Sequence, residues 1–268
     1  WTVVIAGIIL TIFVAFVIIG GLQRISAVAQ VVVPFMAAAY IIAAVLILIL
    51  NYKAIPGAIV EIVQSAFGMR AVAGGALGAM MLAMQKGIAR GIFSNEAGIG
   101  SAPIAAAAVQ TTEPVRQGLV SMLGTVIDTI IICTMTGLSI VITGSWDKGL
   151  EGVAVTTRAF QVGLPFPGRV SAFILMLCLV FFAFTTILGW DYYSERCLDY
   201  LTGNNKKVVR TYRWIYIACV FIGPYMTVSA VWTIADIVNG LMAIPNLIAL
   251  LALNGVVVAE TKKYFQKF

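Results

Sequence analysis

The chain has 268 residues, of which 61% are hydrophobic and only 10% are charged, and its formal net charge is +6. Because about a quarter of the residues in a soluble domain are charged, this composition excludes a soluble globular protein and indicates a membrane protein with several spans. The sequence has no histidine, which excludes HExxH metalloprotease sites, serine–histidine triads and histidine proton relays.

Apolar runs long enough to cross a membrane alternate with polar connections along the chain. We expect seven spans, at 2–20, 27–50, 71–108, 118–143, 170–190, 214–229 and 231–259. Three of the intervening segments are expected to be a turn at 20–26, a loop with a short amphipathic or re-entrant helix at 51–70, and a long mixed connection at 144–168. Trp1 opens directly onto an apolar run, with neither a methionine nor a basic region before it, so we expect the sequence to be the C-terminal part of a longer chain.

The apolar segment 71–108 is too long for one straight span. A helix of its 38 residues would measure about 57 Å, against a hydrocarbon core of roughly 30 Å. Within it, Gly87–Pro103 reads GIARGIFSNEAGIGSAP, with four glycines and several polar residues. A break near 93–100 therefore fits, with Ser101 as the N-cap and Pro103 in the first turn of a restarted helix.

Such a break would place free N–H groups and the positive end of a half-helix at mid-membrane, where they suit a carboxylate. The alternative is a kinked helix whose polar residues bond to neighbouring helices. The last span is also expected to be broken, because Asn239, Gly240, Pro245 and Asn246 interrupt it. We expect Asn239, Asn246 and Asn254 to hold that helix together through side-chain hydrogen bonds.

The distribution of basic residues predicts the orientation, because cytoplasmic loops carry more lysine and arginine. Alternate connections place ten on one side, namely Arg24, Arg116, Arg196, Lys206, Lys207, Arg210, Arg213, Lys262, Lys263 and Lys267. The other side receives Lys53, Arg70, Lys148, Arg158 and Arg169. The loop 199–213 and the C-terminus are therefore expected to be cytoplasmic, and the basic charge also predicts attraction to anionic lipid.

The stretch GIFSNEAGIGSAPIAAAA resembles the signature of the alanine or glycine:cation symporter family, sodium-coupled carriers of the amino acid–polyamine–organocation superfamily. LAMQKGIARG, TTILGWDYYSER and ADIVNGLMAIPNLIALL are similar to that family as well. The resemblance covers most of the chain. It implies an all-α transmembrane bundle of the leucine-transporter type, in which two inverted five-helix repeats each begin with a broken helix.

The resemblance also implies a division of the chain. Residues 1–50 would be the last two helices of the first repeat, 51–70 an extracellular loop, 71–259 the second repeat and 260–268 a cytoplasmic tail. The first three helices of the first repeat, and their share of the site, would then lie upstream of Trp1.

Sodium and substrate contacts are expected from two stretches. The resemblance implies a sodium site with ligands from the Phe182 carbonyl, Thr185 and Thr186. From the residues alone, these threonine hydroxyls could equally bond to carbonyls of their own helix. The expected substrate contacts are Phe93, Ser94, Asn95, Gly98, Ile99, Thr186 and Trp190, although Trp190 could instead be an interfacial anchor.

The predicted function is sodium-coupled symport of alanine or glycine across the plasma membrane of a prokaryote, and not catalysis. One alternative is the same fold driven by protons, with Glu96 or Asp128 titrating. Two others are an intramembrane hydrolase that uses Ser94 and Lys86, and a membrane scaffold without transport. Lys86 and Arg90 could also line a water-filled vestibule or pair with Glu61.

Overall fold

The computed structural model describes residues 1–67 and 75–267, and all the regular elements in these residues are helices. This confirms the all-α class. The chain divides into two compact units, each made from two stretches of sequence. Unit 1 comprises Trp1–Ile47 and Leu150–Val231, and unit 2 comprises Leu48–Gly149 and Trp232–Phe268. The predicted division into inverted repeats stays a prediction.

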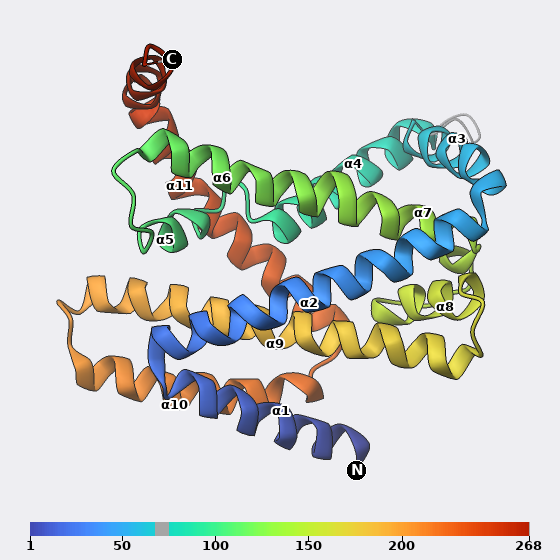
Figure 1. Ribbon diagram of the computed structural model, residues 1–268, viewed down its shortest axis with the longest axis horizontal. Coiled ribbons are helices and arrows are strands. Elements are labelled where there is room, and N and C mark those ends of the chain that lie inside the picture. Colours follow the sequence, from blue (N-terminus) through green and yellow to red (C-terminus); the bar gives the residue numbers. More distant parts are fainter. Residues whose placement is uncertain (68–74, 268) are drawn as a thin grey trace. The chain divides into compact units, whose positions relative to one another are not determined.

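Unit 1 is built around a pair of adjacent antiparallel helices, α9 and α10, with α1 packed beside them and α8 against α9 (Figure 1). Its elements are α1 (Thr2–Ile18), α2 (Gly21–Leu50, as far as Ile47), α8 (Val153–Gly163), α9 (Gly168–Leu201), α10 (Lys206–Ile222) and the 3-10 turn η4 (Gly223–Tyr225). The turn between α1 and α2 depends on Gly21, whose φ of +72° favours glycine.

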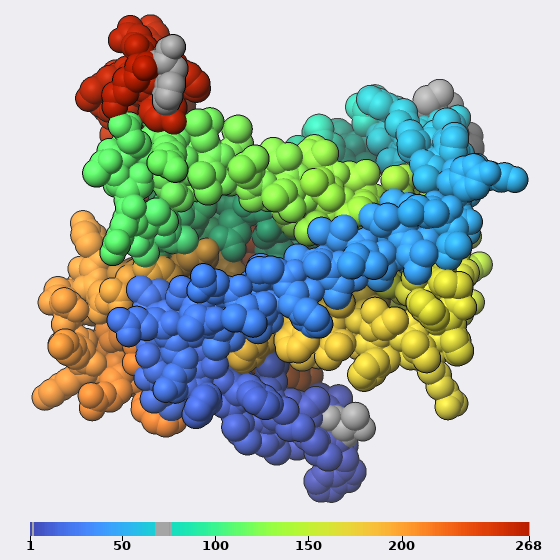
Figure 2. Space-filling model, viewed as in Figure 1, coloured from blue at the N-terminus to red at the C-terminus, as the bar shows by residue number. Residues whose placement is uncertain are grey.

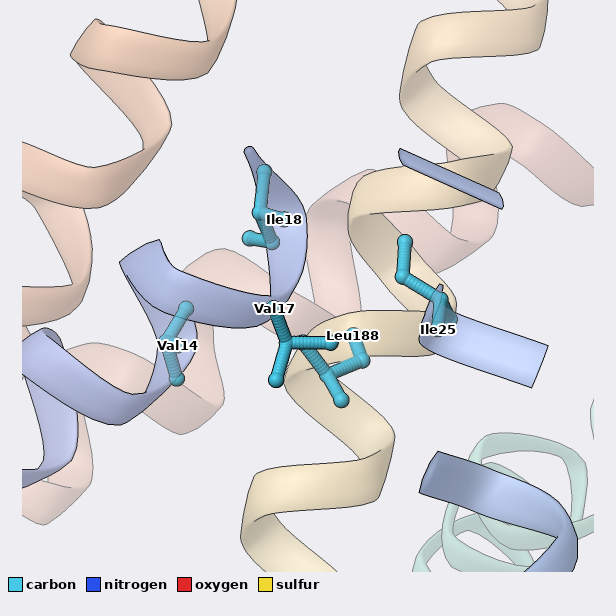
Figure 3. Close-up of a cluster of buried hydrophobic side chains, with 5 residues drawn as sticks. All are labelled: Val14, Val17, Ile18, Ile25 and Leu188. Atoms are coloured by element: carbon cyan, nitrogen blue, oxygen red, sulfur yellow. The ribbon is translucent and has the colours of Figure 1, made fainter. Parts of the chain in front are cut away.

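A small apolar core joins three helices of unit 1. Figure 3 shows Val14, Val17 and Ile18 of α1 with Ile25 of α2 and Leu188 of α9. Tyr216 packs against this core, and its side-chain hydroxyl donates a hydrogen bond of 2.8 Å to the Ile187 carbonyl. The core is therefore apolar, and the polar group at its edge is satisfied.

Unit 2 contains the expected helix break. Its elements are η1 (Tyr52–Ala54), α3 (Ile55–Ala66), α4 (Ala76–Asn95), α5 (Ala102–Ala106), α6 (Pro114–Val126), the π-helical η2 (Ile127–Cys133), α7 (Thr134–Ile142), η3 (Ser145–Asp147) and α11 (Val228–Phe265, from Trp232 onward). The elements α6, η2 and α7 follow one another without interruption and form one long helix. Figure 2 shows part of this helix in green on the surface, and exposed apolar side chains such as Val120, Leu123 and Ile130 suit a lipid-facing flank.

Four helices in the described residues are long and apolar enough to cross a membrane, which fits a multi-pass membrane protein. They are Gly21–Leu50, Pro114–Ile142, Gly168–Leu201 and Val228–Phe265, and Val3–Ile18 is a shorter apolar helix. The number of seven spans stays a prediction. Helix α3 confirms the short helix expected in 51–70, of which residues 68–70 lie outside the described residues, as do 71–74 of the third expected span.

The predicted break in the last span is wrong, because α11 runs continuously from Val228 to Phe265 with Pro245 inside it. A proline removes one backbone hydrogen bond, and membrane helices tolerate this loss when neighbouring groups compensate. The Asn246 side chain bonds to another segment of unit 2 instead of bridging a break in its own helix.

Three expected boundaries also differ from the structure. Residues 21–26 are the start of α2 rather than a turn, because the turn is confined to residues 19 and 20 and Gly21, with its positive φ, already begins the helix. The connection 144–168 contains α8, and the helix expected at 214–229 begins at Lys206, after the capping side chain of Asn205. In each case, polar residues that looked like loop lie on an exposed helix surface.

Candidate functional site

The helix break predicted in Gly87–Pro103 is present, at residues 96–101. Helix α4 ends at Asn95, and Glu96 takes a left-handed conformation with a φ of 56°. Gly98 and Gly100 follow, with φ values of 85° and 88°. The Asn95 side-chain oxygen accepts a 2.9 Å hydrogen bond from the Ala97 amide and closes the turn. The two glycines are what permits this path, since other residues rarely adopt such angles.

Ser101 lies at the N-cap position of α5, as predicted, but its side chain makes no capping hydrogen bond. Its buried hydroxyl donates a 2.7 Å hydrogen bond to the Glu96 carboxylate and does not cap α5. A carboxylate is a stronger acceptor than a neutral group, and the left-handed turn at Glu96 brings it within reach. Pro103 lies in the first turn of α5 as predicted, but that helix has only five residues.

Two side chains at the end of α4 bond to the π-helical segment of unit 2. The Ser94 hydroxyl donates to an Asp128 carboxylate oxygen at 2.7 Å and lies 4.0 Å from the Cys133 sulfur. The Asn95 amide donates to the Thr129 hydroxyl at 3.0 Å. Single π-helical turns occur frequently at functional sites. Asp128, which the sequence left without a named partner, thus belongs to the break.

Helix α11 contacts the break from another direction. The Asn246 amide donates a 3.0 Å hydrogen bond to the Gly98 carbonyl, which the broken helix leaves without a helical partner. A Cβ atom at Gly100 would lie only 3.3 Å from the Asn246 side chain. Gly100 is therefore needed for its backbone angle and for this close approach.

A charged and aromatic cluster lies on the α4 side of the break. Arg90 forms two parallel 3.0 Å hydrogen bonds with the Asp236 carboxylate. Its guanidinium lies 3.8 Å from the ring centroid of Trp232, which in turn packs edge-to-face on Phe93 at 5.0 Å. The first contact is a favourable cation–π interaction. The second is a favourable edge-to-face arrangement of two aromatic rings. Arg90 is thus committed to Asp236, and not to the Glu61 pairing considered from the sequence.

The contacts place the break halfway along two long helices of unit 2. Asp128 is 14 residues from Pro114 and 14 from Ile142, the ends of the α6–α7 span. Asn246 is 18 residues from Val228 and 19 from Phe265 in α11. Both helices are long enough to cross a membrane. Irregular backbone inside a membrane survives only when protein or water satisfies it, so the position of the break at mid-depth stays a prediction.

The residues predicted from α9 all lie in unit 1. The Thr185 hydroxyl donates to the Phe181 carbonyl at 2.9 Å and to the Phe182 carbonyl at 3.2 Å. This is the local bonding that the sequence left open as an alternative. Thr186 is exposed, and Trp190 is half-buried against Tyr193, with ring centroids 5.7 Å apart.

The structure thus brings the candidate residues together in two groups. Phe93, Ser94, Asn95 and Gly98 surround the break in unit 2, where Ile99 is buried with 2% of its surface exposed. Phe182, Thr185, Thr186 and Trp190 follow one another along α9. Sequence reasoning missed Thr129, Trp232 and Asp236. The spacing of Trp232 and Asp236, four residues apart on one face of a helix, was the available signal.

Comparison with known proteins gives the family context of this break. The profile of the sodium:alanine symporter family matches residues 1–268, the whole chain. The chain belongs to that family.

Several relatives carry names that bear on function. The chain is 53% identical over 267 residues to an uncharacterized transporter of Haemophilus influenzae, covering 99% of this chain and 58% of the relative. It is 47% identical over 264 residues to the sodium/alanine symporter AgcS of Methanococcus maripaludis, with 97% and 56% covered. It is 36% identical over 265 residues to the sodium/proton-dependent alanine carrier protein of Bacillus sp. PS3, with 93% and 58% covered. The chain therefore spans little more than half the length of these relatives.

Proposed function

We propose that this protein is a secondary active transporter that couples sodium entry to uptake of a small neutral amino acid, alanine or glycine. The observation that carries the proposal is the polar break near the middle of two membrane-length helices, in a chain of the sodium:alanine symporter family. Broken helices of this kind bind solutes at mid-membrane in secondary transporters, which expose the site alternately to the two sides.

The proposed substrate contacts in unit 2 are Phe93, Ser94, Asn95, Gly98 and Ile99. Ser94 and Asn95 are polar side chains whose partners, Asp128 and Thr129, belong to the same protein network. A bound amino acid would form hydrogen bonds with the side chains of that network. Its charged amino and carboxylate groups would therefore keep hydrogen-bond partners after they leave water. Trp190 and Thr186, which the family resemblance implies as further contacts, would limit the size of the side chain by steric exclusion.

The proposed sodium ligands are the Phe182 carbonyl, Thr185 and Thr186. The Thr185 hydroxyl and the Phe182 carbonyl are 3.2 Å apart, so two oxygen ligands already share one turn of α9. Hard cations prefer such oxygen ligands. To bind sodium, the Thr185 hydroxyl would turn its proton away and offer its oxygen lone pairs.

A proton-coupled transporter is the second candidate, and the carboxylates of the break favour it. Glu96 and Asp128 each accept a 2.7 Å hydrogen bond from a serine hydroxyl at the helix break. Intramembrane carboxylates are frequent proton carriers. The hydrolase alternative has no such support, because the Ser94 hydroxyl donates to Asp128 rather than forming a dyad with Lys86.

Uptake of labelled alanine and glycine by proteoliposomes tests the proposal. We expect an inward sodium gradient at fixed pH to drive uptake, and a proton gradient without sodium to be ineffective. Uptake that ignores sodium and follows the proton gradient would favour the second candidate. No uptake of either amino acid, in protein that retains its helicity, would overturn the choice of substrate.

Thr185→Val tests the sodium ligand, because valine keeps the shape and removes the hydroxyl. We expect the sodium concentration for half-maximal uptake to rise at least about tenfold, as for loss of one ligand oxygen worth more than about 1.4 kcal/mol. Thr157→Val is the matched control, since its hydroxyl also bonds to its own helix, at Val153, in α8 outside the site. An unchanged sodium dependence in Thr185→Val would remove this residue from the site.

A further inference from the structure

A basic cavity lies where the C-terminal end of α9 meets the N-terminal end of α10, inside unit 1. Its volume is about 280 Å³, and none of its lining residues belongs to the helix break. Its lining residues are Arg196, Asp199, Asn204, Lys206, Val209, Arg210 and Arg213. Four cationic side chains therefore surround a space with one carboxylate in its wall.

The two helices supply these cations in an ordered way. Lys206, Arg210 and Arg213 lie at spacings of four and three residues, on one face of α10. Arg213 forms a partly buried ion pair with Glu195, and Arg196 pairs with Asp199 at 2.9 Å. Neither Lys206 nor Arg210 has an ion-pair partner within residues 1–67 and 75–267. The cavity thus keeps two positive charges that the protein leaves uncompensated there.

Exposed apolar and aromatic side chains are sequence neighbours of the residues that line this cavity. Tyr200 and Leu201, next to Asp199 at the end of α9, are 88% and 78% exposed. Trp214, next to Arg213 on α10, is 60% exposed. Tyrosine and tryptophan gather at the level of lipid headgroups, where one end of the ring is apolar and the other wet. Such residues beside the cavity would suit a position at the membrane–water interface.

We propose that this cavity binds the phosphate headgroup of an anionic phospholipid. Lys206 and Arg210 would contact the phosphate oxygens, and Arg196 and Arg213 would add charge while keeping their own ion pairs. Basic pockets between membrane helices are suited to such headgroups. The exposed Tyr200, Leu201 and Trp214 favour a lipid over free phosphate, because acyl chains would cover them and a free ion would not.

Native mass spectrometry of the detergent-purified protein, supplied with equal amounts of phosphatidylglycerol and phosphatidylcholine, measures the binding. We expect wild-type protein to retain phosphatidylglycerol selectively. In a Lys206→Gln/Arg210→Gln variant, we expect the preference to fall roughly ten- to thirty-fold, since each juxtamembrane cation is worth about 1 kcal/mol. Arg196 and Arg213 are left unchanged, because their loss would break existing ion pairs.

The matched control is Lys262→Gln/Lys263→Gln, which removes two charges from the end of α11, outside the cavity. It should retain the lipid as wild type does. Equal loss of phosphatidylglycerol in both variants would show a general charge effect and overturn the proposal. Retention of the lipid by the Lys206/Arg210 variant at the wild-type level, with unchanged helicity, would also overturn it. Displacement of the lipid by inorganic phosphate at millimolar concentration would identify free phosphate as the ligand and overturn the lipid assignment. The readout is binding, so it stands independently of the proposed transport activity.

Discussion

Two constraints require a glycine at position 100: its φ is positive, and the Asn246 side chain lies close to it. A Cβ atom there would meet Asn246 at 3.3 Å, whereas one at Gly98 would meet nothing within 4 Å. Both glycines have φ values that side chains adopt only with strain. Comparison of the two positions therefore separates backbone strain from packing against α11.

We expect Gly98→Ala to lower the free energy of unfolding by about 1–2 kcal/mol, the cost of the left-handed conformation. Gly100→Ala should lose about 1 kcal/mol more, because the Asn246 side chain must move. Unfolding in detergent, followed by circular dichroism, measures both. An equal loss of unfolding free energy in the two variants would show that the Asn246 side chain moves aside without an energetic penalty.

The sequence could predict the break but not the contacts that satisfy it. Length arithmetic and glycine content located the interruption within a few residues. Ser101 occupies the predicted N-cap position, but its hydroxyl bonds to Glu96 instead of capping the helix, and this bond depends on a backbone turn that no pattern specifies. Arg90, likewise, bonds to Asp236 across 146 positions of sequence.

Similar glycine- and asparagine-containing segments interrupt the helix after α4 but leave α11 continuous, although α11 also contains Pro245. The difference lies in backbone angles. Gly98 and Gly100 take positive φ values, whereas Pro245 has its φ fixed near the helical value and only removes one donor. A composition-based prediction does not distinguish these cases.

The ion pair between Glu195 of α9 and Arg213 of α10 predicts a large effect on stability. Glu195 is buried and accepts two hydrogen bonds from the guanidinium. Glu195→Gln should lower the free energy of unfolding by about 3 kcal/mol, since it leaves a partly buried cation unpaired. Lys263→Gln, which loses only an exposed pair with Glu260 at 3.9 Å, should change it by less than about 1 kcal/mol. Similar losses in the two variants would contradict this account.

Lys267, just after α11, donates a hydrogen bond of 2.6 Å to the carboxylate of Glu113, just before α6. The hydrogen bond to Glu113 raises the pKa of Lys267. The contact is therefore present at neutral pH and lost only as the pH rises through the raised pKa. A spin label at Gln266 should be immobile at pH about 8 and should gain mobility as the pH rises above about 10.4, the ordinary pKa of a lysine. In Glu113→Gln the label should already be mobile at the lower pH, and a label at Asn204, used as the control, should not respond.

For the molecule as a whole, this contact supports one part of the predicted orientation. The loop that precedes α6 and the C-terminal tail meet within unit 2, and the distribution of basic residues placed both on the same side of the membrane. Which side that is remains a prediction, and the excess of lysine and arginine indicates the cytoplasm.

Labelling of intact cells with an impermeant maleimide tests the orientation. In a background without the four native cysteines, we expect Lys207→Cys and Lys262→Cys to be protected until the membrane is permeabilised. Lys148→Cys, in the exposed turn after η3, should react at once. Reaction of all three in intact cells would contradict an internal position for the basic loop and the tail, and the reverse pattern would invert the topology.

The hydrogen bond between Asn246 and Gly98 also has a consequence for biosynthesis. Its two residues are 148 positions apart, so at about 5–20 residues per second the ribosome completes Asn246 roughly seven to thirty seconds after Gly98. Meanwhile Asp128 and Thr129, 34 positions beyond Ser94 and Asn95, are the earlier partners that the break can find. A nascent chain that stops before α11 should thus hold a half-satisfied polar turn in the bilayer, and we expect the insertion machinery to retain it until the last helix arrives.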